Sequence, residues 1–195
     1  MTADSLDRVP LSSGQPLPDG FFDRPVLEVA PELLHKSLVT GGRRGRIVEV
    51  EAYDGENDPG SHGWRGPTPR TRVMFGPPAY WYVYLSYGLH WCANVVCGPD
   101  GTCSAVLLRA VDPLEGLDEI RSRRGPGVRD RDLTNGPGKL GQAFDVDESL
   151  YGTHIASSRL RIVDDGVAPP PRPDRSRRIG LSEGRGEDLL WRFTP

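Results

Sequence analysis

The 195-residue sequence is poor in cysteine and contains no long apolar run. Its three cysteines, Cys92, Cys97 and Cys103, are odd in number and lack the close paired spacing of a zinc site, and only His90 stands near them. We therefore expect buried, reduced thiols without a metal or a disulfide. No stretch approaches the ~20 apolar residues that span a bilayer, and the N-terminus lacks a basic-then-apolar signal pattern. These absences predict a cytoplasmic protein without a membrane partner.

Positive net charge is also missing, because the formal net charge of the chain is −3. On its own this total argues against a polyanionic partner. Lysine occurs at only two positions, so 22 of the 24 basic residues are arginine, which is better suited to planar, bidentate contact with phosphate. A bias in genome base composition explains the same excess equally well. The arginines cluster at 43–46, 65–72, 121–131 and 172–178, and clustered charge steers a partner more than the net total does.

The periodicity of apolar residues divides the chain into elements. Residues 1–22 are polar and contain three prolines, which predicts a flexible arm before one domain over residues 23–195. Helical spacing is found over 26–39, and residues 46–53 alternate as a strand. Further strands are expected at 80–86, 90–97 and 103–111, a long loop at 54–79, and helices at 113–124 and after Gly136. Short turns between the three strands predict an antiparallel meander.

Two acidic residues stand two positions apart on the first strand. The alternation places Ile47, Glu49, Glu51 and Tyr53 on one face. We interpret Glu49 as part of a solvent-facing polar edge. Glu51 lies near the strand end, beside the long loop, which is a common place for a catalytic base. Alternatively, Glu49, Glu51 and Asp54 could bind a divalent ion in a nuclease.

The second strand is rich in aromatic residues. Its tyrosines at 80, 82 and 84 share one face, opposite Trp81, Val83 and Leu85. Core packing of a sheet explains such residues, but Tyr87 falls at the tip of the predicted hairpin, where an aromatic ring can wedge between stacked bases. The segment from Gly136 to Lys139 is typical of a helix start that holds a phosphate, although it does not match the full nucleotide-binding loop pattern.

Taken together, these segments resemble the alkyladenine (3-methyladenine) DNA glycosylase family. The resemblance covers about residues 25–193. Its motifs, in order along the chain, are residues 47–53 (IVEVEAY), His62, residues 68–75 (TPRTRVMF), residues 82–88 (YVYLSYG), Asn94, residues 106–110 (VLLRA) and residues 136–140 (GPGKL). It implies an α+β fold, a single compact domain around a curved, mainly antiparallel β-sheet with a β-hairpin that presents aromatic residues to DNA.

The resemblance also implies roles for individual residues. Glu51 would activate the attacking water, and Arg109 would help to place that water together with a backbone carbonyl near Ile179. The base pocket would be lined by Tyr53, His62 and Tyr84, with Asn94 excluding guanine through its exocyclic amine. Tyr87 would fill the gap left in the duplex. Contacts to the DNA backbone would come from Arg70, Arg72, Gly138 and Lys139.

The function implied is removal of alkylated or deaminated purines from duplex DNA, which leaves an abasic site. The expected partner is damaged double-stranded DNA, with no cofactor, no metal and no obligate protein partner. Strand cleavage by a lyase step needs an amine nucleophile, and only Lys36 and Lys139 are available, so we expect base removal alone. The competing hypotheses are the metal-dependent nuclease, a non-catalytic protein that binds DNA lesions, and a structural domain whose tyrosine strand is simply core.

Overall fold

A computed structural model describes residues 14–195, in which nine strands form one antiparallel sheet. The strand order is β1-β7-β2-β3-β6-β5-β4, and β9 pairs with β3 while β8 pairs with β9. The strands are β1 (Gln15–Pro16), β2 (Ser37–Thr40), β3 (Arg43–Tyr53), β4 (Trp81–Ser86), β5 (His90–Val96), β6 (Ala105–Glu115), β7 (Arg161–Asp164), β8 (Asp174–Ser176) and β9 (Arg192–Thr194). The predicted meander is confirmed as β4-β5-β6, and β6 continues the sheet to β3.

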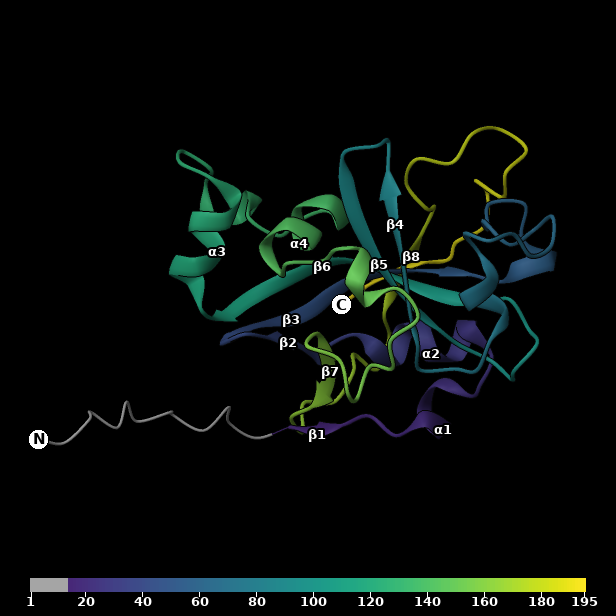
Figure 1. The fold of residues 1–195 in the computed structure, drawn as a ribbon, viewed down its shortest axis with the longest axis horizontal. Helices are drawn as coiled ribbons and strands as arrows, with labels where there is room; N and C mark the ends of the chain where they lie inside the picture. The colour runs from purple at the N-terminus through teal and green to yellow at the C-terminus, as the bar shows by residue number, and fades with distance from the viewer. Residues whose placement is uncertain (1–13) are drawn as a thin grey trace, which may run out of the picture.

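Short helices pack around this curled sheet (Figure 1). The α-helices are α1 (Asp19–Phe22), α2 (Val26–Leu33), α3 (Leu117–Arg124) and α4 (Pro137–Ala143), and single 3₁₀ turns occupy η1 (Gly55–Asn57), η2 (Arg72–Phe75), η3 (Asp130–Asp132) and η4 (Glu148–Leu150). The expected α+β class and single compact domain are confirmed. None of the helices in the described range is long and apolar enough to cross a membrane.

The hydrophobic core lies between α2, α4 and the inner face of the sheet. Helix α2 buries Val29 and Leu33, and β4 contributes Trp81, whose indole N–H donates to Ser158 and to the carbonyl of Leu160, both at 3.0 Å. Trp81 therefore belongs to the core. The opposite face of β4 carries Tyr82 and Tyr84 into a separate, smaller cluster.

Two predicted helices are shorter than expected. The helix predicted over 26–39 ends at Leu33, and residues 37–40 form β2, where Leu38 is buried as a strand residue. His35, with φ of 67°, turns the chain between the two elements. The helix predicted over 113–124 begins at Leu117, because β6 extends to Glu115 in its pairing with β3.

An irregularity in β3 decides which side chains reach the functional face. The register between β3 and β6 shifts on both sides of Glu49, as at a β-bulge. Ile47 is consequently buried in the core with Val50 and Ala52, so the predicted common face of Ile47 and Glu49 is wrong. Glu49 and Glu51 lie on the opposite side, where both contact Arg109 of β6.

Part of the predicted arm lies outside the described residues, which begin at residue 14. From Gln15 onward the chain joins the domain: β1 pairs with β7, and Leu17 and Phe22 are buried.

Candidate active site

The carboxylate of Glu51 is fully buried and held by three neighbours. Its Oε1 accepts a hydrogen bond from the backbone N–H of Ile179 at 2.7 Å, and its Oε2 accepts one from the Tyr53 hydroxyl at 2.8 Å. The guanidinium of Arg109 lies 3.3 Å from Oε1. A buried carboxylate is tolerated when it is paired and hydrogen-bonded in this way. The backbone N–H of Ile179 thus holds Glu51, which is a different contact from the backbone carbonyl near Ile179 that the family resemblance implies for placing the water.

Glu49 does not form the solvent-facing polar edge that was expected. Its Oε1 accepts from the Nε atoms of both Arg109 and Arg192 at 2.7 Å. Burial would raise the pKa of Glu49, but the two arginines hold it below its usual value. Burial likewise would lower the pKa of Arg109, yet Glu51 and Glu49 hold it above its usual value. Glu49 therefore fixes Arg109 as a cation beside Glu51.

A cavity of about 590 Å³ lies directly in front of these groups. Tyr82 and Tyr84 are stacked in its wall with ring centroids 5.8 Å apart, and His62 meets Tyr84 edge-on at 4.6 Å. Asn94 is buried on β5 and donates to the carbonyl of Tyr82 at 3.0 Å. The structure thus brings Arg109 together with the pocket residues expected from the sequence, which are Tyr53, His62, Tyr84 and Asn94. Stacked rings with a few polar groups suit a flat heterocycle.

His62 stands at the rim of this cavity, partly open to solvent, with Nδ1 2.9 Å from the Tyr82 hydroxyl. Burial against the cavity wall and the nearby charge of Arg70 lower its pKa from 6.5 to about 4. The imidazole is therefore neutral at pH 7. The unfolded chain binds this proton below pH ~6.5 and the folded chain does not, so the contribution of His62 to stability falls as the pH drops toward 4.

We predict that the ring protons of His62 titrate near pH 4 in an NMR titration of the folded protein, without a transition near 6.5. The His62→Gln variant serves to assign the resonance. A midpoint close to 6.5 would contradict a desolvated imidazole.

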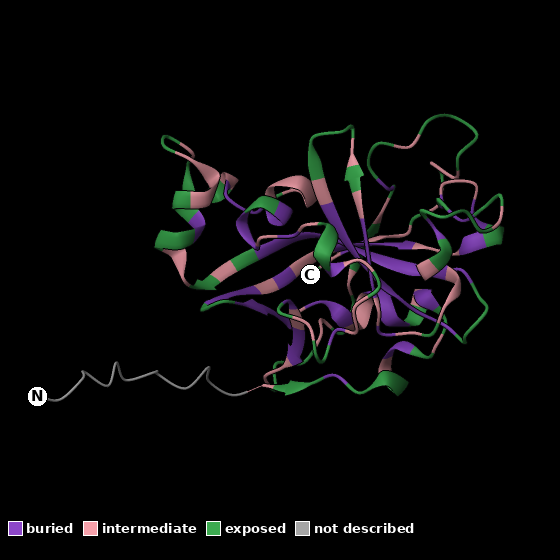
Figure 2. Cartoon of the chain, viewed as in Figure 1, coloured by how far each residue is buried: buried purple, intermediate pink, exposed green. Residues whose placement is uncertain are grey.

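The tip of the β4–β5 hairpin is coloured as exposed in Figure 2, and three apolar side chains there are exposed. Tyr87 is 90% exposed, Leu89 74% and Leu85 39%. The turn is possible because Tyr87 and Gly88 both have positive φ, 50° and 68°. Large exposed apolar groups gathered on a protruding turn indicate a contact surface, in agreement with the predicted position of Tyr87.

The residues expected at the DNA backbone lie on two sides of the hairpin. Arg70 lines the cavity with its guanidinium 5.3 Å from the centre of the Tyr84 ring, and Arg72 is exposed in η2. On the other side, Lys139 donates to Asn135 at 2.7 Å. Gly138 has a packing role, because a Cβ there would lie 2.8 Å from the Cβ of His90. In this segment Pro137, rather than Gly138 or Lys139, lines the cavity.

The contacts of several site residues could not be predicted from the sequence. Arg192 reaches Glu49 from a strand 143 positions away. Arg178 and Asp58 form a buried ion pair beneath the site, and the Arg178 guanidinium lies 4.6 Å from the centre of the Tyr53 ring. Both contacts join remote segments, so no local spacing reveals them.

The three cysteines are free and buried, as predicted, and Cys92 lines the cavity. Within residues 14–195 no three His, Cys, Asp or Glu side chains are grouped as metal ligands. Glu49 and Glu51 are instead joined through Arg109, and Asp54 lies beside Asn57. The carboxylate cluster of the nuclease hypothesis is therefore not formed.

Comparison with known proteins gives a consistent result over nearly the whole chain. The model of the methylpurine-DNA glycosylase (MPG) family matches residues 20–195. A protein of Burkholderia lata is 50% identical over 191 residues, which cover 96% of this chain and 91% of that protein. Proteins of Streptomyces avermitilis (46% identity, 91% and 86% covered) and Frankia casuarinae (51%, 86% and 79%) are also similar. All three carry the name "Putative 3-methyladenine DNA glycosylase". The matched range contains every residue of the cavity.

Proposed function

The chain belongs to the methylpurine-DNA glycosylase family, and on that premise we propose that it flips alkylated or deaminated purines out of duplex DNA and hydrolyses their glycosidic bonds. A base inside a duplex cannot be reached, so it must be extruded at a cost of a few kcal/mol, which is lowest for a damaged or mispaired base. The product is an abasic site and a free purine such as 3-methyladenine, 7-methylguanine or hypoxanthine.

The observation that carries the proposal is the charged pair of Glu51 and Arg109, of which Arg109 lines an aromatic cavity and Glu51 lies buried behind its wall. When the glycosidic bond breaks, its electron pair leaves with the base and positive charge develops on the sugar. An ionised carboxylate stabilises that charge and takes a proton from the water that attacks the sugar carbon. Glu51 is assigned this role, with the guanidinium of Arg109 3.3 Å from its Oε1.

Access to Glu51 requires a local movement. The carboxylate has no exposed surface, and both Tyr53 and Ile179 occupy its oxygens while also lining the cavity. Entry of a nucleotide must shift one of these groups before a water can reach Glu51. Tyr53 is suited to this, because its ring is assigned to stack on the flipped base.

Selection among purines is assigned to the aromatic walls and to Asn94. A cationic alkylated purine is attracted to the electron-rich faces of Tyr53 and Tyr84, and stacking contributes ~1–3 kcal/mol per base. A buried Asn94 would clash with the exocyclic amine of guanine and leave other purines unaffected.

Tyr87 is assigned to fill the space that the flipped base leaves. We predict that Tyr87→Ala reduces base release from duplex DNA and leaves the urea unfolding midpoint unchanged, because the side chain is 90% exposed and makes little packing contact. Release from single-stranded DNA is the internal control, because removal of a base from it leaves no gap in a duplex for Tyr87 to fill. Equal losses on both substrates would argue against a wedge.

Base removal without strand cleavage is supported by the position of the two lysines. Lys36 pairs with Asp164 at 2.7 Å and Lys139 bonds Asn135, and neither lines the cavity. The amine that a lyase step requires is therefore missing from the cavity wall.

The test is single-turnover base release from duplexes that carry one 3-methyladenine or one hypoxanthine, measured in EDTA. Strand breaks are scored with and without subsequent alkali. We expect free base in EDTA and breaks only after alkali. Tight lesion binding without release would identify a lesion-binding protein, loss of activity in EDTA a metal enzyme, and breaks before alkali a lyase.

A further inference from the structure

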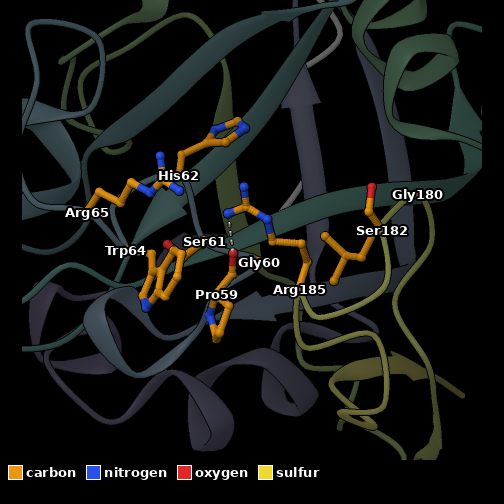
Figure 3. Close-up of a pocket in the computed structure, with 10 residues that line it drawn as sticks. Pro59, Gly60, Ser61, His62, Trp64, Arg65, Gly180, Ser182 and Arg185 are labelled. Atoms are coloured by element: carbon orange, nitrogen blue, oxygen red, sulfur yellow. Dashed lines mark hydrogen bonds between the residues drawn. The ribbon is translucent and has the colours of Figure 1, made fainter.

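A second cavity, of about 370 Å³, adjoins the base cavity (Figure 3). It lies between the loop that follows β3 and the loop that joins β8 to β9. The two cavities share Gly60, His62, Gly180 and Leu181, so a group bound in one is a direct neighbour of a group bound in the other. Of the residues that were given a role above, only His62 lines this second cavity.

Two arginines and a tryptophan make one edge of the second cavity cationic. The guanidinium carbons of Arg65 and Arg185 lie 5.6 and 5.5 Å from the centre of the Trp64 ring, within cation–π range. Arg185 is also fixed by a hydrogen bond to the carbonyl of Pro59 at 3.2 Å. The hydroxyl-bearing residues Ser61 and Ser182 complete the polar lining. Trp64 thus holds two cations at the edge of one concave site.

These cations are not neutralised within the part of the chain that the structure describes. No carboxylate there forms an ion pair with Arg65 or Arg185, whereas many other arginines, such as Arg123 and Arg159, are paired with acids. Glu187, close to Arg185 in sequence, accepts instead from the backbone N–H groups of residues 184 and 185 at 3.0 Å. Two exposed guanidiniums without a carboxylate partner are suited to an oxyanion that can accept their hydrogen bonds.

We propose that this cavity binds a phosphodiester group of the DNA strand that carries the flipped nucleotide. Arg65 and Arg185 hold the backbone while the base occupies the adjoining cavity, and His62 lies at their common wall. The inference rests on the proposed glycosylase function. It also reconciles duplex binding with a net charge of −3, because the acidic residues pair with arginines elsewhere and leave these cations free for phosphate. A purine ring is a poorer occupant, since the cavity presents cations rather than open stacked rings.

The test measures how lesion-duplex affinity depends on salt for wild type, Arg65→Ala, Arg185→Ala and the double variant. Each lost phosphate contact lowers the magnitude of the slope of log K against log salt by about 0.9. Because both arginines would contact the same phosphate, we expect the full decrease in the double variant and a smaller decrease in each single variant. Arg172→Ala is the matched control, because Arg172 is exposed and lines neither cavity. Arg65→Lys, which keeps the charge, should retain the slope.

Neutral methylphosphonate linkages, placed in turn on each side of the lesion, locate the phosphate. One position should weaken binding to wild type and have no further effect on the double variant. If the Arg65 and Arg185 variants keep the wild-type slope, or if every linkage affects wild type and double variant equally, the phosphate subsite is wrong although base release persists. If wild type neither binds nor releases the base, the glycosylase function fails and the subsite with it.

Discussion

Glu51→Gln is expected to lower the single-turnover rate of base release by a factor of ~10²–10⁴, the usual contribution of a general base. Glutamine has the same size and still offers a carbonyl oxygen to the N–H of Ile179 or the hydroxyl of Tyr53. It cannot accept the proton of the attacking water, and it carries no charge to stabilise a cationic sugar. Binding of the lesion duplex should therefore remain within a few-fold of wild type.

The measurement is release of labelled base at saturating protein in EDTA, with binding followed separately by fluorescence anisotropy. Glu49→Gln is the matched control: it also removes one carboxylate from β3, but it acts through the position of Arg109. We expect a smaller loss of rate in this variant, with Glu51 still able to take the proton. A wild-type rate in Glu51→Gln would remove Glu51 from the role of base. Loss of binding together with a lowered unfolding midpoint would instead indicate a damaged fold.

The local elements of the fold were predictable because their signals are local. Alternation reveals β3 and β4, and the Gly88 turn reveals the hairpin between β4 and β5. The bulge beside Glu49 was not predictable, since both faces of residues 47–50 carry residues compatible with burial, and pairing with β6 decides which of them turns inward. Strand pairing likewise overrides helical spacing after Val26. Residues 37–40 pair with β3 and β7, so the helix that begins at Val26 ends at Leu33.

The residues of the candidate site also differ in whether the sequence predicts their positions. The tyrosines of β4 and Asn94 lie on two strands joined by a short turn, so their convergence could be expected. Glu51 lies on β3, which pairs with β6 and not with the next strand in the sequence, and only the family resemblance placed it beside them. Glu49 was misinterpreted because both of its partners, Arg109 and Arg192, lie more than fifty positions away. Ion pairs of that kind are set by the tertiary fold, and one sequence contains no spacing that reports them.

Removing the carboxylate of Asp58 is expected to have the largest effect on stability. Both side chains of the Asp58–Arg178 pair have no exposed surface. Arg178 also donates to the carbonyl of Ala52 at 2.9 Å and to that of Gly186 at 3.2 Å. Asp58→Asn leaves a buried guanidinium without its counter-charge, and breaking a buried pair in this way costs about 3–5 kcal/mol. Urea unfolding of the variant measures the loss directly.

This loss should extend to activity, because Arg178 immediately precedes Ile179, whose N–H holds Glu51. When the anchor is lost, the loop no longer fixes that donor, so base release should fall even at temperatures where the Asp58→Asn variant remains folded. The double variant Asp58→Asn/Arg178→Met separates the two effects: it removes the stranded charge and should recover part of the stability lost in Asp58→Asn, while base release stays low because the loop is still unanchored. The single variant Arg178→Met completes the comparison. If the losses in free energy of unfolding of Asp58→Asn and Arg178→Met simply add in the double variant, the two side chains are not coupled, and the anchoring of Glu51 through this loop must be abandoned.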